Sequence, residues 1–180
     1  MAESIHKEVL LKSGPEPPGR VRWLIGRRSL ISAFAWVGVS ARASAAPSAD
    51  KGRTSLHQES DFPGDAQRIY DALLQPEAFA ALSGEAADIS PREGAAFTLF
   101  AGKIVGRNIE LVPGARIVQA WRPAYWPPGV YSLVKFELRQ HGTLTTVVLD
   151  QTGIPPGNFV HLDAGWRARY WEPLRKYLTE

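Results

Sequence analysis

The last third of the chain limits the possible folds more than any other part of the sequence. Apolar and charged side chains alternate along residues 134–139, which is the period of a strand with one buried face. After a short turn, residues 143–151 form a second run rich in threonine and valine, which favour strands. Glycines and prolines at 153–157 end this pair, and an aromatic-rich stretch at about 160–178 is expected to form a helix. A helix laid across a curved antiparallel sheet encloses space, so this order predicts a protein with a cavity.

The residues before this region predict a first strand, two short helices and a series of further strands. The first strand is expected at 56–61. Asp65 is placed to cap one helix, and Pro76 begins a second helix that Gly84 ends. Short strands are then expected at residues 87–89, 95–100, 104–111 and 116–122. The sequence therefore predicts an α+β fold, with a curved antiparallel sheet of six or seven strands around a long C-terminal helix and two short helices after the first strand.

The expected C-terminal helix contains one proline. Pro173 has no N–H to donate to the carbonyl of Arg169, so a kink is expected near Arg169 and Tyr170. Helical spacing predicts one stripe that faces the sheet, with Trp166, Tyr170 and Tyr177 beside it. The predicted members of this inward stripe are Ala164, Ala168, Trp171, Leu174 and Leu178.

Several segments of the sequence resemble the START-like superfamily, also called SRPBCC. They are TGIPPGN and GWRARYWEPLRKYL near the C-terminus, preceded by VYSLVKFEL, and upstream HQESDFPGDAQRIYDALLQPEAFAAL, ELVPGARIVQAWR and WPPGVYS. The resemblance covers roughly residues 54–178, and within the superfamily the chain is most similar to the domain named after the activator of Hsp90 ATPase. It implies a helix-grip fold, in which the sheet wraps around the C-terminal helix. Members of this group bind or transform many different ligands.

Residues 1–50 differ from the rest and read as a twin-arginine-type signal peptide and linker. Arginines at 27–28 precede an apolar run at 30–39, and a small-residue cleavage motif, Ala-Ser-Ala, follows at 43–45. An apolar run of this length is too short to anchor the protein stably in a membrane. Residues 51–180 are therefore assigned to the START-like domain, and the protein is expected to be periplasmic or otherwise exported. The alternative is a basic extension on a cytoplasmic protein.

The charge of the chain lies mainly outside the predicted domain. Seven Lys and Arg against three Asp and Glu give residues 1–49 a charge of +4, whereas fourteen against fifteen give residues 50–180 a charge of −1. A domain without a basic excess is not expected to bind nucleic acid. The absence of cysteine from the sequence excludes disulfides and thiolate metal sites.

Aromatic residues near a proline-rich loop are the strongest indication of a binding site. The loop at 122–129 holds large rings close to the ends of two predicted strands, where they suit an apolar ligand with one polar end. The alternative is that these rings pack under the terminal helix. The residues predicted to line or gate the ligand site are Phe97, Trp121, Trp126, Tyr131 and Tyr170.

The sequence carries no recognisable catalytic motif. It has no glycine-rich phosphate loop, no G-x-S-x-G and no H-E-x-x-H, and the histidines of the domain are far apart. No metal and no cofactor are therefore expected, and catalytic residues are not assigned. His161 is expected near the rim of the cavity. An unpaired charge that faces inward is costly, so the polar residues of the strands are expected to lie mostly on the outer face of the sheet. These residues are Arg107, Glu110, Arg122, Asp150 and Gln151.

Three functions are compatible with these patterns. The leading interpretation is an exported protein that binds a small hydrophobic or amphipathic ligand between the sheet and the C-terminal helix. The second is a cavity enzyme, a cyclase, dehydratase or hydrolase, that acts on a small aromatic or lipid-like substrate. The third, regulation of a chaperone ATPase, follows from the family resemblance and requires a cytoplasmic protein. No pattern in the sequence indicates an oligomeric state.

The signal-peptide interpretation predicts cleavage near Ala46 during export. Fractionation of cells that express the full chain shows whether the protein is exported, and N-terminal sequencing shows where it is cleaved. Replacing Arg27 and Arg28 by lysine is expected to block export, because the twin-arginine route recognises the arginine pair. An intact N-terminus in the cytoplasm, or unchanged export of the double variant, would contradict the interpretation.

Overall fold

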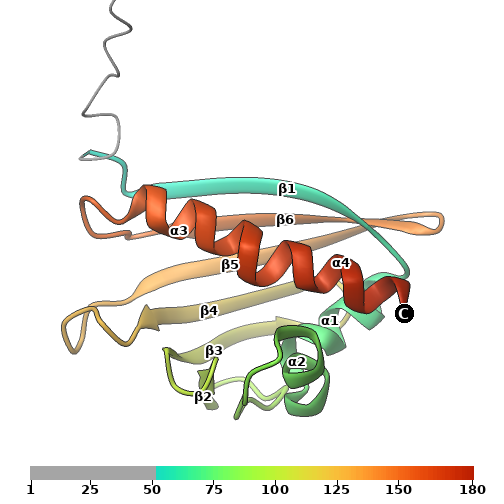
Figure 1. The fold of residues 1–180 in the computed structure, drawn as a ribbon, viewed down its shortest axis with the longest axis horizontal. Coiled ribbons are helices and arrows are strands. Elements are labelled where there is room, and N and C mark those ends of the chain that lie inside the picture. The colour runs from blue at the N-terminus through green and yellow to red at the C-terminus, as the bar shows by residue number, and fades with distance from the viewer. Residues whose placement is uncertain (1–51) are drawn as a thin grey trace, which may run out of the picture. The chain divides into compact units, whose positions relative to one another are not determined.

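Residues 52–180, which the computed structural model describes, form a six-stranded antiparallel sheet with a long helix across one face (Figure 1). The strand order is β1-β6-β5-β4-β3-β2. The strands are β1 (Ser55–Pro63), β2 (Ala96–Leu99), β3 (Ile104–Val112), β4 (Arg116–Pro123), β5 (Ser132–His141) and β6 (Leu144–Thr152). The predicted α+β helix-grip fold is thus confirmed.

The sheet has six strands, the lower of the two numbers that the sequence predicted. The stretch at 87–89 makes only an isolated bridge, between Asp88 and Thr98, beside the short edge strand β2.

No helix within residues 52–180 is long and apolar enough to cross a membrane. The predicted signal peptide and its cleavage site lie outside the described residues.

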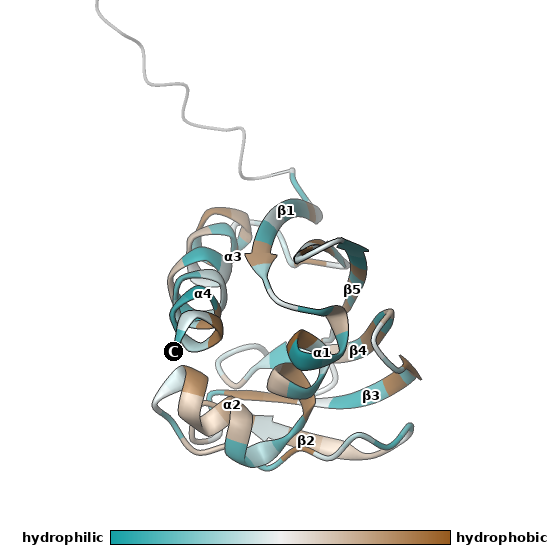
Figure 2. Cartoon of the chain, turned by 90° about the vertical axis from the view of Figure 1, so that its right-hand side faces the viewer, coloured by the Kyte–Doolittle hydropathy of each residue, from teal (hydrophilic) through white to brown (hydrophobic). Residues whose placement is uncertain are grey.

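Two short helices follow β1, and their ends are set by local chemistry. α1 (Ala66–Leu74) begins at Asp65, whose side chain accepts a hydrogen bond of 2.7 Å from the backbone N–H of Arg68. α2 (Pro76–Ser83) starts with proline and ends at Gly84, which adopts a left-handed φ of 70° that glycine tolerates without strain. Both helices lie near the last turns of the C-terminal helix, where their apolar residues complete the core (Figure 2).

The C-terminal helix consists of three consecutive parts: α3 (Phe159–Trp166), the π-helical turn η1 (Arg167–Trp171) and α4 (Glu172–Thr179). In η1 the N–H of Glu172 bonds the carbonyl of Arg167, five residues back. The wider turn lies directly before Pro173, which cannot donate to the carbonyl of Arg169. The predicted irregularity therefore occurs where the proline requires it, as a widened turn that lets the helix continue.

The π turn changes which side chains face the sheet. Trp171, Leu174 and Leu178 are buried as predicted, but Ala164 and Ala168 are exposed. In the first half of the helix the buried residues are instead Leu162, Trp166 and Tyr170. The predicted inward stripe is therefore wrong before residue 170, because the extra residue of a π turn shifts the helical phase, which a regular period of 3.6 residues does not allow for.

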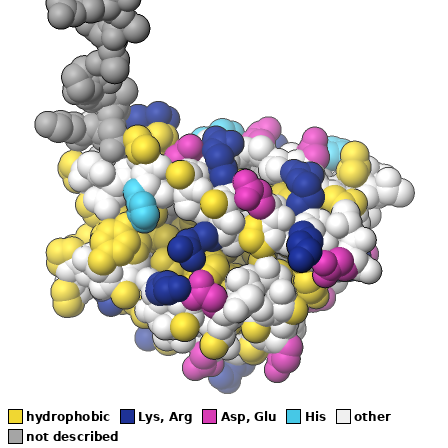
Figure 3. All heavy atoms as spheres, in the orientation of Figure 1, with side chains coloured by type: hydrophobic (Ala, Val, Ile, Leu, Met, Phe, Trp, Pro, Cys, Tyr) yellow, Lys and Arg dark blue, Asp and Glu magenta, His cyan; other side chains and the backbone are white. Residues whose placement is uncertain are grey.

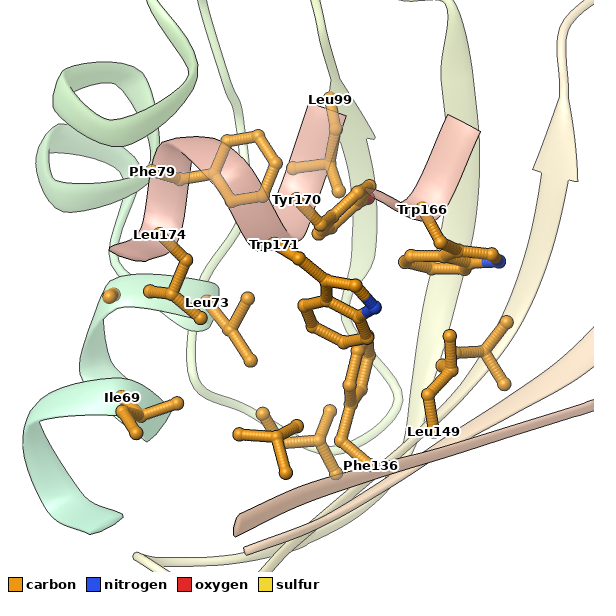
Figure 4. Close-up of a cluster of buried hydrophobic side chains, with 14 of the residues drawn as sticks. Ile69, Leu73, Phe79, Leu99, Phe136, Leu149, Trp166, Tyr170, Trp171 and Leu174 are labelled. Atoms are coloured by element: carbon orange, nitrogen blue, oxygen red, sulfur yellow. The ribbon is translucent and has the colours of Figure 1, made fainter. Parts of the chain in front are cut away.

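The core fills the space between the sheet, the C-terminal helix and the two short helices. Figure 4 shows Trp171 over Phe136, with Leu174 turned towards side chains of α1 and α2. The rings of Phe136 and Trp171 meet edge to face at 6.4 Å, and the ring of Phe62 lies 5.7 Å from that of Trp171. Such contacts add to the stabilisation that comes from burying the rings themselves.

Two buried glutamines of the sheet hold two tryptophans of the C-terminal helix. Gln58 of β1 accepts a hydrogen bond from the indole N–H of Trp171, and its own amide donates to the Asp163 carboxylate at 2.8 Å. Gln151 of β6 accepts from the indole N–H of Trp166 at 2.7 Å. Because both glutamines are at most 5% exposed, each bond satisfies groups that water does not reach. These bonds set the position of the helix along the sheet.

Trp171→Ala is expected to lower the free energy of unfolding by about 3–5 kcal/mol, because it removes a large core ring and leaves Gln58 without its donor. Denaturant unfolding of the domain measures the loss. Leu144→Ala is the matched control, since Leu144 is 49% exposed and its truncation is expected to change stability by less than about 1 kcal/mol. Equal losses in the two variants would show that Trp171 does not anchor the helix.

Candidate functional site

A pocket of about 420 Å³ opens between the first half of the C-terminal helix and the β2–β3–β4 side of the sheet. Its lining is mostly apolar and includes five aromatic rings. The apolar lining residues are Phe100, Ile104, Trp121, Pro123, Tyr125, Leu162, Ala164, Gly165, Trp166, Ala168 and Tyr170. A concave, ring-lined space of this volume is within the range of small-molecule binding sites.

Small residues on the helix leave this space open. Ala164, Gly165 and Ala168 line the pocket on the helix side, and a Cβ atom built on Gly165 would meet no atom within 4 Å. Ala164 and Ala168 are the two positions that the regular helical period wrongly assigns to the core. Because their side chains are small, the helix and the sheet do not close on each other here.

A strained turn carries one wall of the pocket. Phe100 and Ala101, between β2 and β3, have φ values of 53° and 52°, a left-handed conformation that residues with a Cβ rarely adopt. The turn directs the Phe100 ring against Phe79 at 5.2 Å and Tyr170 at 5.3 Å. The surrounding aromatic contacts therefore maintain a backbone shape that places Phe100 at the pocket.

The inner end of the pocket is a cluster of tilted rings from the helix and from β4. Trp166 lies 4.3 Å from Tyr170 and 5.3 Å from Trp121, measured between ring centroids. Burial strongly raises the pKa of the Tyr170 hydroxyl, and the nearby Trp121 indole partly offsets this rise. Tyr170 thus stays protonated in any ordinary buffer and can donate a hydrogen bond.

The five residues predicted to form the ligand site occupy different places in the structure. Trp121 and Tyr170 line the pocket. Phe97 is buried under Gly106, where an added Cβ would lie 2.2 Å from the Phe97 ring. Tyr131 is 46% exposed, with the Arg122 guanidinium 5.7 Å from its ring.

The fifth predicted residue, Trp126, lies behind the pocket wall. It is 4% exposed, packs edge to face on Trp121 at 6.4 Å and donates its indole N–H to the side chain of Asn158 at 3.0 Å. The neighbouring Tyr125 is 60% exposed, borders the pocket and lies 5.9 Å from the His161 ring. The proline-rich loop therefore presents Tyr125 to the mouth and uses Trp126 as support.

Charged side chains gather at the mouth of the pocket. Glu85, which follows α2, accepts hydrogen bonds from Lys103 at 2.6 Å and from Arg169 at 3.3 Å. The hydrogen bond from Lys103, with a smaller contribution from Arg169, lowers the pKa of the Glu85 carboxyl. His161 also lies at the rim, next to Tyr125, as its position near the start of the helix predicts.

The remaining polar strand residues do not converge on the pocket. Asp150 lies on the outer face, where its carboxylate bonds His57 at 2.7 Å and Lys135 at 3.1 Å. Gln151 faces inward but already holds Trp166. Within residues 52–180 no cluster of three His, Asp or Glu residues is arranged to hold a metal ion.

Sequence reasoning missed the pocket residues that lie in the turn between β2 and β3 or within the π turn. Phe100 and Lys103 belong to a turn whose left-handed backbone has no glycine at its first two positions, and Arg169 is placed by the widened helical turn. Tyr125 could have been suspected, because it belongs to the aromatic, proline-rich loop. The sequence does not show, however, which ring of that loop points outward.

Comparison with known proteins identifies relatives of this domain. The family described as "Activator of Hsp90 ATPase homolog 1-like protein" matches residues 64–179. The activator of 90 kDa heat shock protein ATPase homolog of Dictyostelium discoideum is 31% identical over 122 residues, which cover 67% of this chain and 32% of that protein. Activator homolog 1 of Homo sapiens is 24% identical over 115 residues, 64% of this chain and 34% of that protein. The chain thus spans about a third of the length of these relatives.

Solved structures with low sequence identity show the same fold. An HSP90 activator from Plasmodium falciparum superimposes with a TM-score of 0.67 at 22% identity, over 71% of this chain and 97% of the other. The Aha1 dimer from Colwellia psychrerythraea gives a TM-score of 0.60 at 15% identity, over 70% of this chain and 96% of the other. The resemblance to the START-like superfamily and its Hsp90-activator group is confirmed.

Truncation of Trp126 is expected to lower stability, whereas truncation of Tyr125 is expected to weaken ligand binding. Trp126→Ala removes a buried ring and its hydrogen bond, so it should lower the free energy of unfolding by about 3–5 kcal/mol. Tyr125→Ala should change that free energy by less than about 1 kcal/mol, yet weaken the binding of an apolar fluorescent probe. Denaturant unfolding and probe titration of both variants measure these effects. A stable Trp126→Ala variant would contradict the assigned support role.

Proposed function

Because the chain belongs to the family of activator of Hsp90 ATPase homolog 1-like proteins, whose fold encloses a pocket here, we propose that its domain binds a small hydrophobic or amphipathic ligand. The site is the pocket between the C-terminal helix and the β2–β3–β4 side of the sheet. The observation that carries the proposal is the open, ring-lined space beside Ala164 and Ala168.

The lining supports binding by burial of apolar surface. Rings of Trp121, Trp166 and Tyr170 form a rigid inner wall, and rigid aromatic groups lose little conformational freedom when a ligand packs on them. Each Å² of apolar ligand surface removed from water contributes about 25 cal/mol before the ordering costs are subtracted. A ligand of one or two rings can thus bind with useful affinity without a metal or cofactor.

The same lining supports binding more directly than catalysis. A cavity enzyme for aromatic or lipid-like substrates usually places an acid–base group with an altered pKa against the substrate. None of the described lining residues is an aspartate or glutamate, and the most deeply buried titratable group there, Tyr170, is held in its protonated form. Tyr170 can orient a ligand by donating a hydrogen bond.

Regulation of a chaperone ATPase is the second candidate, and the names of the relatives favour it. Because this chain spans about a third of those proteins, their activity comes to it only as a proposal. Such a role would use the surface of the domain and a cytoplasmic location. The proposed export through residues 1–50 argues against it, because the ATP-dependent partner works in the cytoplasm.

Filling the pocket tests the binding proposal. Ala164→Trp places a large side chain in the space and is expected to weaken binding of N-phenyl-1-naphthylamine, an uncharged fluorescent probe, by at least about tenfold, which corresponds to about 1.4 kcal/mol. Ala164 is exposed, so the variant should still fold. Ala81→Trp, at an exposed position of α2 outside the lining, is the matched control and should bind like the unchanged protein.

Two outcomes would contradict the proposal. One is equal probe affinity in Ala164→Trp and Ala81→Trp, which would place the probe elsewhere. The other is stimulation of a chaperone ATPase by the domain that Ala164→Trp leaves intact while no probe binds the unchanged protein. That result would favour the surface role.

A further inference from the structure

We propose that the pocket selects an anionic amphiphile, a small molecule with a ring-sized apolar body and an acidic group, such as a carboxylate or sulfonate, at one end. This inference rests on the proposed function, because it names the chemical class of ligand for the same pocket. The apolar body would lie against the rings of Trp121, Trp166 and Tyr170, and the acidic group would lie at the mouth.

The charges of the mouth are unbalanced. Among the described residues of the lining, the charged side chains are Lys103 and Arg169, and neither Asp nor Glu is present. Glu85, just outside the lining, pairs with both cations through its two different carboxylate oxygens. Two positive side chains therefore share one negative side chain, and the rim keeps an excess positive charge. Figure 3 shows Lys and Arg side chains beside an acidic one and next to a hydrophobic region on this face.

Lys103 and Arg169 also retain donors for a ligand. The side chain of each is more than half exposed, and the hydrogen bond to Glu85 is the only one that each makes among the described residues. An ammonium group has three N–H donors and a guanidinium group has five. An acidic group at the mouth can therefore accept charge-assisted hydrogen bonds from both without displacing Glu85.

The interior of the pocket suits the apolar body of such a ligand. The indole N–H of Trp166 donates to Gln151, and the indole nitrogen of Trp121 is covered by protein atoms next to the Tyr170 hydroxyl. The rings of these residues, rather than their N–H groups, therefore meet the ligand, and its acidic group is left to bind the cations of the rim.

A ligand of another charge fits these groups less well. A cationic ligand would place its charge beside Lys103 and Arg169, where like charges repel. An uncharged apolar ligand would gain the burial of its rings but nothing from the rim. The charge of the ligand, at constant ring size, is therefore the property that the rim discriminates.

A matched pair of fluorescent probes tests this selection. 1-Anilinonaphthalene-8-sulfonate carries an acidic group, and N-phenyl-1-naphthylamine has the same rings without it. The quantity to measure is the ratio of their dissociation constants, sulfonate over uncharged probe, for the full domain at low ionic strength. A change in pocket shape that weakens both probes by the same factor cancels in this ratio.

Substitutions at the rim are expected to move this ratio in opposite directions. Lys103→Gln and Arg169→Gln should each raise it about threefold to fivefold, the range of a partly exposed ion pair. Glu85→Gln should lower it, because both cations then act on the ligand alone. Arg167→Gln removes a cation that pairs with Asp163 away from the lining, and this control should leave the ratio unchanged. About 0.5 M salt should reduce every difference by screening.

The outcomes separate this inference from the proposed function. If both probes bind in the pocket but the ratio is the same in all four variants, the selection of an anionic ligand is wrong and the binding function stands. If Glu85→Gln raises the ratio, Glu85 rather than the cations organises the rim, and the inference also fails. If neither probe binds the unchanged domain, the proposed function itself fails.

Discussion

The position of the C-terminal helix depends on two hydrogen bonds between indole N–H groups and buried glutamines. Gln58 on β1 and Gln151 on β6 hold Trp171 and Trp166, so the helix is tied to two adjacent strands at points five residues apart in its sequence. In a dry interior each such bond is directional, whereas ring packing alone tolerates sliding. Everything that the helix brings to the sheet follows from this placement, including the core and the pocket.

The π turn between these two anchors links stability to the pocket. Tyr170 and Trp171, consecutive residues of this turn, are both buried, the first beside Trp166 and the second in the core. The wider π turn rotates the chain by less per residue than the about 100° of a regular helix, so these two side chains point closer together. With both buried, the alanines and glycine of the same helix are left facing open space. The pocket therefore lies beside α3 and the turn in which the helix accommodates Pro173.

Much of the fold follows from the sequence because its signals are local. The cap at Asp65, the helix end at Gly84 and the alternation along β5 all depend on residues within one turn or one strand. The site was only partly predictable, because it depends on long-range geometry. Of the residues expected at the ligand site, Trp121 and Tyr170 line the pocket, whereas Phe97 and Trp126 are buried outside its lining. The charged rim required knowledge of which turns meet Arg169 in space.

The central claim is that the space between the helix and the sheet is a ligand site whose inner rings meet the ligand. NMR spectra of the tryptophan indole N–H groups, recorded while the sulfonate probe is added, test it most directly. The account predicts a shift of the Trp121 signal, because the Trp121 side chain lines the pocket and an aromatic probe beside it changes the magnetic environment of the indole. The Trp171 signal should stay in place, because Gln58 holds that N–H within the core. An unchanged Trp121 signal at saturating probe, or a larger shift at Trp171 than at Trp121, would contradict the account.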